Sequence, residues 1–563
     1  MTIVLAAWLA IQLPALCAVS RLWPDRDVLD RWIWAGLAGL GAAIYLAVAA
    51  SYAQLYLFFP LWIAAAAAAV VAWVRSPRRA ALTGPIDRTA LLVFVVCAVP
   101  RFVVAAAHEL PPGWDPTFHL VLARKILTTA HAIHDWAPFE DIALNYPTGS
   151  HTLVAVFAAA TRLPLHTVFN WLEPLLGTLT VAAVFLFAAA TTRNREVARY
   201  AAAAYGLLAN WGGLDYYRWG GLPNLTAMVL LLGALTLAAE APPFPRSNQV
   251  LFGGFVASMA LAHHHVMLAA GAILIVLLAA DTIGGVRERR RGVVFGLVVA
   301  ALLSAAFLIP YALKIWDIGK TSALDVENPI ALADWLPYLG PALVWLAAGG
   351  ILVAATSRAA TRPNGVAWSM LAALFGAFIV LEYVVRGLTA HGRGPGVLAF
   401  TPSRFLTDGV YVLAVFAGWG VWWVRSHLRF RSAAALALTV VLLLGLTQSS
   451  RWRHLFTIPT VPAPMWEAYT WVDAHTPPDT LVLARGRWSV YGTWRRTLET
   501  SVPASEPSVA DTAKQRMMQE LLAGGRPADA GDAEVVAIRD TGPGPNEQVL
   551  WRHPSGVAVV RVR

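Results

Sequence analysis

Long uninterrupted apolar runs constrain this chain more than any other feature. Two of them, Val293–Leu313 and Phe405–Val424, reach the length of about 20 residues that an α-helix needs to cross a bilayer. Similar runs recur along the chain. Of its 563 residues, 58% are hydrophobic and 13% are charged, whereas soluble globular proteins have about 25% charged residues. We therefore predict a polytopic α-helical membrane protein with about 14 transmembrane helices.

The distribution of basic residues predicts the orientation of these helices. The net charge is +10, but the arginines lie mainly in short loops between apolar runs. This pattern follows the positive-inside rule and does not indicate a nucleic-acid partner. We therefore place these short loops in the cytoplasm and the alternate set of longer loops, with the C-terminal tail, outside the plasma membrane. The longer loops are residues 108–165, 211–222, 314–335 and 387–404.

Composition divides the chain into three parts. Residues 1–87 contain N-terminal membrane helices, and residues 88–448 contain the remaining helices together with the first long loop. Residues 449–563 are more polar and combine an amphipathic segment with short β-branched runs, which indicates a small extracytoplasmic α/β domain. The strand-like runs are Thr480–Ala484, Glu534–Ile538 and Val557–Val562.

The first long loop contains the most informative candidate pair. Asp115 precedes Pro116, a residue favoured in the first turn of a helix, and His119 follows one turn later on the same side. A carboxylate beside a histidine can act as a general base or join a cation site. The alternative is that Asp115 only caps the helix and that His119 only packs at the interface.

Further acids of this loop lie near aromatic residues, which often line sugar sites. Asp135 is adjacent to Trp136, and Asp141 precedes Tyr146. We select Asp135, Asp141 and Tyr146 as candidate substrate-binding residues. The alternative for the two acids is that they are solvated loop residues without a direct role.

The second long loop, Trp211–Asn224, combines glycine pairs with several aromatic residues. Aromatic belts at a membrane interface explain part of this composition. They do not explain the glycine pairs or the close spacing of Asp215 and Arg218. We therefore select Asp215, Tyr217 and Arg218 as substrate-binding candidates.

Two further positions suit a phosphate. Three consecutive histidines, His263 to His265, cannot all ligate one metal from a helix, because neighbouring side chains diverge by about 100°. Either one of them, for which we select His264, faces a phosphate-bearing ligand, or all three pack at the interface. Arg404 stands at the entrance of an apolar helix, where its guanidinium either reaches the interface or binds a phosphate through two hydrogen bonds.

Four short motifs, in this order and topology, resemble the glycosyltransferase C (GT-C) superfamily of multi-pass membrane enzymes. They are Trp114–His119, Tyr146–Gly149, Pro402–Phe405 and Trp471–Asp479. The resemblance covers about residues 88 to 563. It implies that Asp115 is the catalytic base and that Arg404 binds the phosphate of a polyprenyl-phosphate sugar.

The resemblance also implies the reaction. A hexosyl or pentosyl group would pass from a polyprenyl-phosphate donor in the membrane to a cell-envelope glycan, lipid or protein acceptor on the outer face. We predict inversion at the anomeric carbon. Many members have paired acids early in the loop, whereas Pro116 follows Asp115 here, which departs from the pattern of a metal-dependent member. The cofactor is therefore left open, with a divalent cation (Mg, Mn or Ca) as the candidate. The alternatives are a lipid-linked saccharide polymerase or ligase, and a lipid-linked saccharide transporter.

Overall fold

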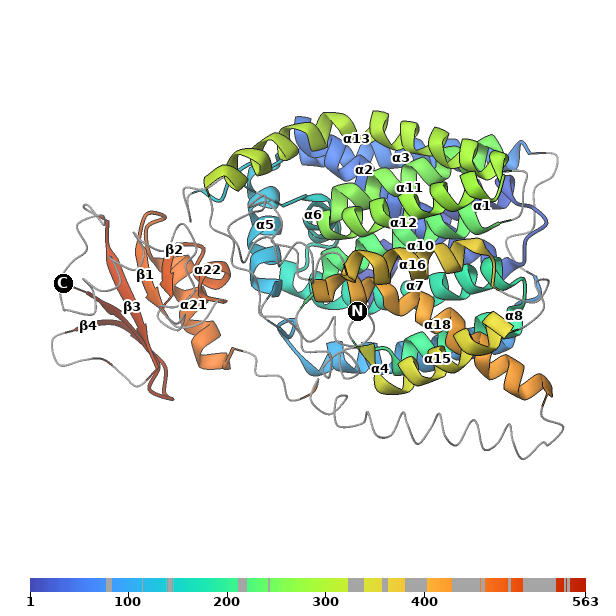
Figure 1. The fold of residues 1–563 in the computed structure, drawn as a ribbon. Coiled ribbons are helices and arrows are strands. Elements are labelled where there is room, and N and C mark those ends of the chain that lie inside the picture. The colour runs from blue at the N-terminus through green and yellow to red at the C-terminus, as the bar shows by residue number, and fades with distance from the viewer. Residues whose placement is uncertain are drawn as a thin grey trace.

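A computed structural model shows a bundle of α-helices with a small α/β domain beyond one end (Figure 1). We call this end of the bundle the domain end and the other the opposite end. The structure describes residues 1–76, 84–113, 115–137, 139, 144, 146–210, 220–240, 244–321, 339–356, 363–379, 402–427, 456, 461–484, 488–499, 533–540, 543 and 547–562.

Eight helical segments in the described chain are long and apolar enough to cross a membrane. This confirms the predicted helical membrane fold, while the number of about 14 spans stays a prediction. The predicted span at residues 433–448 lies outside the described residues. The eight segments belong to α1 (Thr2–Leu22), α2 (Val28–Ala53), η1 with α3 (Leu55–Leu57 and Phe58–Val74), α4 (Arg88–Ala107), α7 (Leu165–Thr192), α10 (Leu222–Ala239), α12 (His264–Ile283) and α13 (Arg287–Thr321).

Further helices complete the described bundle and its domain end. Small residues allow some of them to approach closely, as membrane helices commonly do. A Cβ atom added at Gly350 would lie 1.9 Å from the carbonyl oxygen of Phe416, and one at Gly418 would lie 2.5 Å from the backbone nitrogen of Ala201. These helices are α5 (Asp115–Thr129), α6 (Gly149–Thr161), α8 (Arg195–Leu208), α11 (Arg246–Ala262), α15 (Pro341–Thr356), α16 (Gly365–Ile379) and α18 (Pro402–His427).

Caps and ion pairs hold the short connections at the opposite end. Asp27, Asp87 and Asn194 accept hydrogen bonds from the first turns of α2, α4 and α8, which is the usual role of these residue types before a helix. Arg195 lies 2.8 Å from Asp30 and 3.4 Å from Asp87. The connections that precede α2, α4 and α8, which belong to the predicted arginine-rich set, therefore meet at one end of the bundle. Their cytoplasmic location stays a prediction.

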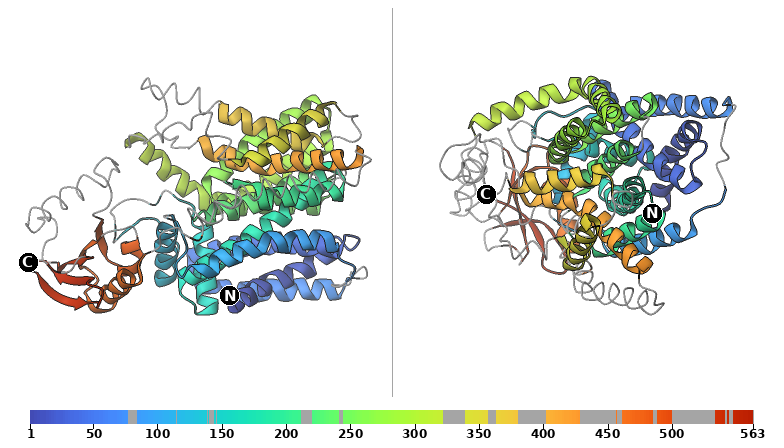
Figure 2. Two further views of the ribbon diagram at one scale, coloured as in Figure 1. Left: turned by 90° about the horizontal axis from the view of Figure 1, so that it is seen from below. Right: turned by 45° about the vertical axis from the view of Figure 1, so that its right-hand side comes forward.

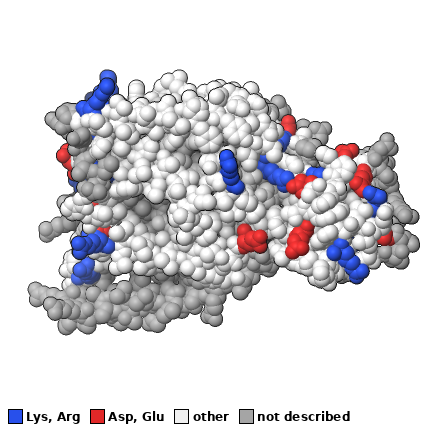
Figure 3. Space-filling view, turned by 180° about the vertical axis from the view of Figure 1, so that it is seen from behind, with Lys and Arg blue, Asp and Glu red and all other residues white. Residues whose placement is uncertain are grey.

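On the face seen in Figure 3, charged side chains lie on either side of a broad uncharged surface of the bundle. This distribution suits a bundle whose middle faces lipid, since a charged side chain in the hydrocarbon region is costly.

The α/β domain contains a five-stranded sheet in the order β2-β1-β3-β5-β4. β1 pairs in parallel with β2 and β3, whereas β5 pairs antiparallel with β3 and β4. The three strand-like runs of the tail form β1, β3 and β5, so these predictions are confirmed. The domain consists of α21 (Ala463–His475), β1 (Leu481–Ala484), α22 (Trp488–Thr493), β2 (Arg496–Glu499), β3 (Val535–Arg539), β4 (Gln548–Arg552) and β5 (Ala558–Arg561).

Candidate functional site

Helix α5 holds the two residues that the sequence pairs. The helix begins at Asp115 itself, so the carboxylate belongs to the first turn, where the partial positive charge of a helix N-terminus stabilises an anion. His119 lies one turn later and is nearly buried. Because residues four apart share a helix face, both side chains line one cavity.

This cavity has a volume of about 200 Å³ and lies at the domain end of the bundle. Its walls come from α5, from the loop before α6, from the start of α10 and from the junction between α11 and α12. The lining combines a carboxylate, imidazoles and an amide with aromatic rings, a mixture typical of sites that orient a polar ligand. The polar groups belong to Asp115, His119, Tyr146, Asn224 and His263, and large rings come from Phe118 and Trp136.

A glycine brings the second long loop against the start of α5. Gly220 has φ +78°, and a Cβ atom there would lie 2.2 Å from both Cδ and Cγ of Pro116. Only glycine adopts this backbone conformation at low cost and allows this approach. The predicted glycine-rich loop thus ends next to Asp115.

A pair of histidines links α5 to α6. His119 Nδ1 and His151 Nε2 are 3.0 Å apart. A hydrogen bond between two imidazoles needs one donor and one acceptor, so at least one ring is neutral. His151 lies in α6, a helix of 13 residues that is too short to cross a membrane. Burial lowers the pKa of its imidazole to about 3. His151 is therefore neutral at physiological pH.

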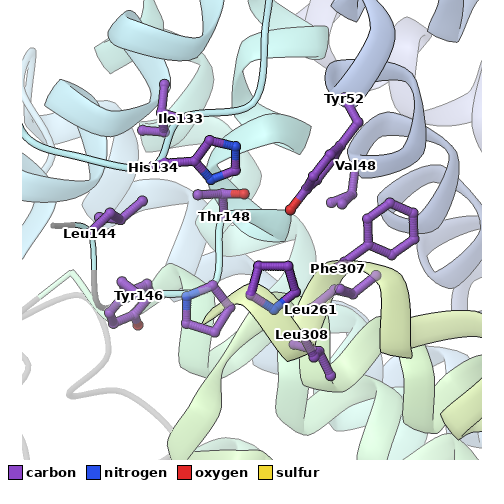
Figure 4. A pocket seen from close by; sticks show the side chains of 12 residues that line it. Val48, Tyr52, Ile133, His134, Leu144, Tyr146, Thr148, Leu261, Phe307 and Leu308 are labelled. Atoms are coloured by element: carbon purple, nitrogen blue, oxygen red, sulfur yellow. The ribbon is translucent and has the colours of Figure 1, made fainter. Parts of the chain in front are cut away.

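The ring of Tyr146 lines a second, smaller cavity as well as the first. The rings of His263 and His264 meet it edge-on, with centroids at 5.5 and 5.1 Å. The second cavity has a volume of about 50 Å³, and its other walls include Tyr52 of α2 and Phe307 of α13 (Figure 4). Tyr146 thus forms part of the wall of both cavities.

The structure brings together some of the predicted site residues and leaves others apart. Asp115, His119 and Tyr146 line the same cavity. Asp135 does not line it; its carboxylate pairs with Lys125 at 2.5 Å and is 56% exposed. His264 packs against Tyr146 without lining either cavity.

Other predicted residues cannot be placed at the site. Asp141, Asp215, Tyr217 and Arg218 lie outside the described residues. Arg404 lies in the first turn of α18, and the structure describes its backbone but not its side chain. The roles predicted for these five residues stay predictions.

Three cavity or neighbouring residues were not selected from the sequence. His151 follows Tyr146 by five residues, so its closeness in the sequence to a predicted site residue was a usable signal. Asn224 is a buried amide in the first turn of the otherwise apolar α10. His263 follows α11, caps α12 by accepting a hydrogen bond from the backbone N–H of Val266, and lines the larger cavity.

The described residues do not by themselves form a site for the candidate divalent cation. Among them, no group of three or more His, Cys, Asp or Glu side chains is arranged to hold a metal ion. The described lining of the larger cavity supplies a single carboxylate, Asp115, whereas Mg and Ca prefer several oxygen ligands. A cation at this site would need ligands from elsewhere in the chain or from a substrate.

No model of a known protein family matches the chain, and no curated protein sequence matches it. The fold is nevertheless similar to solved structures. The oligosaccharyltransferase of Archaeoglobus fulgidus aligns with a TM-score of 0.58 and 13% identity, over 81% of this chain and 70% of that chain.

Two further solved structures are similar over most of this chain. ArnT from Cupriavidus metallidurans aligns with a TM-score of 0.51 and 14% identity, over 84% of this chain and 97% of that chain. The arabinofuranosyltransferase AftD from Mycobacteria aligns with a TM-score of 0.55 and 14% identity, over 85% of this chain and 42% of that chain. The resemblance to the GT-C superfamily is thus confirmed at the level of the fold.

Proposed function

We propose that this chain is a membrane glycosyltransferase that transfers a sugar from a polyprenyl-phosphate donor to an acceptor of the cell envelope. The observation that carries the proposal is the position of Asp115 in the first turn of α5, where it lines the larger cavity together with His119. The GT-C fold supports the reaction class. The acceptor would be a glycan, a lipid or a protein on the outer face of the plasma membrane.

A lipid-linked donor is supported by a similar structure. The oligosaccharyltransferase AglB from Archaeoglobus fulgidus, which aligns with a TM-score of 0.56 and 14% identity, was solved with an inhibitory peptide and a dolichol-phosphate. In this chain we assign the donor phosphate to Arg404, because a guanidinium matches a phosphate with two parallel hydrogen bonds.

Asp115 would act as the general base. An acceptor hydroxyl oxygen attacks the anomeric carbon of the donor sugar while Asp115 takes the hydroxyl proton. The bond between the anomeric carbon and the phosphate oxygen breaks, and polyprenyl phosphate leaves with the electron pair. A single displacement of this kind inverts the anomeric configuration. The helix N-terminus favours the carboxylate form of Asp115, which the reaction requires.

The histidine pair would hold His119 near this base without adding a charge from His151. His151 is neutral, so the hydrogen bond between the two rings can orient His119 beside Asp115. Because His151 is neutral, His119 can still accept a proton from the reacting groups or donate one to them.

Transfer of radiolabelled sugar from a panel of polyprenyl-phosphate donors tests the proposal. The purified full chain in lipid nanodiscs is compared with Asp115→Asn and with Asp135→Asn. We expect wild-type transfer with inverted product, and a loss of about 10²- to 10⁴-fold in Asp115→Asn, the range that general-base catalysis contributes. Donor binding in that variant should be retained.

Three outcomes would contradict parts of the proposal. Product with retained configuration would exclude the single displacement. Wild-type activity in Asp115→Asn together with a collapse in Asp135→Asn would move the base to Asp135. Absence of transfer with every donor and acceptor pair would count against a glycosyltransferase.

A further inference from the structure

Helix α5 lies between the bundle and the α/β domain (Figures 1 and 2). It contacts α6 and α7 of the bundle and also α22 of the domain. Asp115 and His119 occupy its first half, and Arg124 occupies its second half. The cavity and the domain contact therefore share one helix of 15 residues, which is about 22 Å long.

Arg124 makes three kinds of contact with the α/β domain. Its Nη2 atom lies 2.5 Å from Oδ2 of Asp473, and its Nη1 atom donates to the backbone oxygen of Tyr491 at 2.9 Å. The guanidinium carbon also lies 4.4 Å from the ring centroid of Trp494. Together these contacts use the fork and the planar face of the guanidinium, which a lysine cannot reproduce.

The domain holds the acceptor for Arg124 in a fixed position. Oδ1 of Asp473 accepts from Nη1 of Arg495 at 3.3 Å. Arg495 also donates to the backbone oxygens of Asp473 and Thr476, at 3.0 and 2.5 Å, and its side chain is 6% exposed. The carboxylate of Asp473 is thus shared between an arginine buried in the domain and an arginine of α5.

Aromatic side chains extend this contact. The ring of Trp494 meets that of Phe139, from the first long loop, with centroids 4.7 Å apart. Trp494 has φ +50°, a left-handed conformation that costs free energy for a non-glycine residue. At the start of α7, Nδ1 of His166 lies 3.4 Å from the hydroxyl oxygen of Tyr491.

We propose that the α/β domain positions α5 through the contact of Arg124 with Asp473 and Trp494, and that Arg124 is a positioning residue for the transfer reaction. A helix moves as a stiff rod over this length, so a shift of its second half is transmitted to Asp115. A misplacement of about 1 Å can reduce a rate by about 100-fold. This inference rests on the proposed function only for its effect on rate, because the mechanical coupling can be measured without turnover.

The test uses the full chain in nanodiscs and two readouts. Arg124→Gln removes the guanidinium but leaves the pair of Asp473 with Arg495 intact. We expect kcat to fall by about tenfold while KM for the donor stays within about twofold, since the interaction serves geometry rather than donor binding. Amide hydrogen exchange should become faster in residues 115–123.

Two further variants separate positioning from general destabilisation. Arg124→Lys keeps the charge and should recover part of kcat. Arg561→Gln breaks an ion pair of 2.6 Å with Glu534 inside the domain, away from α5, and should leave both kcat and the exchange of α5 unchanged.

The amide exchange of α5 and the value of kcat together decide the inference. Unchanged amide exchange in α5 of folded Arg124→Gln would overturn it, as would an equal change in Arg561→Gln. Faster exchange with a reduced kcat would support it. Faster exchange in a protein whose wild type shows no transfer would support the coupling and would contradict the proposed function.

Discussion

Replacing Gly220 by alanine tests whether the end of the second long loop fixes the start of α5. Gly220 precedes α10 and has φ +78°. A Cβ atom there would lie 2.2 Å from two ring carbons of Pro116, the residue next to Asp115. The substitution therefore disturbs the candidate base through its neighbour without changing a group that could take part in the chemistry.

The expected magnitude has two parts. Alanine in a left-handed conformation costs about 1 to 2 kcal/mol. Non-bonded carbon atoms are in favourable contact at about 3.5 to 4.0 Å, so the loop or the start of α5 must move by about 1.3 Å or more. A displacement of this size at a catalytic group reduces the rate by about 100-fold, which corresponds to about 2.7 kcal/mol in the barrier.

The measurement is kcat for sugar transfer in nanodiscs, with Gly285→Ala as the matched control. Gly285 has φ +70° and no atom within 4 Å of the added Cβ, so it carries the same backbone strain without the clash. We expect a large fall in Gly220→Ala and little change in Gly285→Ala. Wild-type kcat in folded Gly220→Ala would refute the reasoning, and equal losses in both would assign the effect to strain.

Two further predictions concern Tyr146 and Asp87. Tyr146→Ala should join the two cavities and admit water, so the ratio of donor hydrolysis to transfer should rise, whereas Tyr146→Phe should keep the wild-type ratio. Burial opposes the charge of Asp87, but hydrogen bonds from Arg199 and from the backbone N–H of Ala90 outweigh it and hold the pKa of the carboxyl below its ordinary value. The contribution of this carboxylate to stability is therefore complete above about pH 4 and is lost as the pH falls through the pKa of Asp87 in the folded protein. The difference in Tm between wild type and Asp87→Asn should thus shrink below about pH 4.

The sequence predicts the elements that form from local patterns. The apolar runs within the described residues became helices, and the β-branched runs of the tail became β1, β3 and β5. β2 and β4 were missed because their formation depends on partners. β2 has four residues with charged ends and pairs with β1, and β4 is largely exposed and pairs with β5.

The same distinction applies to the candidate site. Asp115 and His119 were paired correctly in space because residues four apart lie on one face of a helix. The contact of His119 with His151 crosses from α5 to α6, and Asn224 arrives from α10. No local periodicity encodes such contacts, since they depend on how the helices pack.

The physics of the membrane nevertheless limits which residues can meet. Irregular backbone is not stable where it is exposed to lipid, because its polar groups would lack partners there, which favours a site built from turns at one end of the bundle. Arg425, near the last turn of α18, donates to the Tyr200 hydroxyl at 2.6 Å beside the ion pairs of the opposite end. α18 has 26 residues and is about 39 Å long, so its first turn, which contains Arg404, lies toward the domain end. A donor phosphate bound by Arg404 and an acceptor hydroxyl facing Asp115 would thus meet at one end of the bundle, which a single displacement at the anomeric carbon requires.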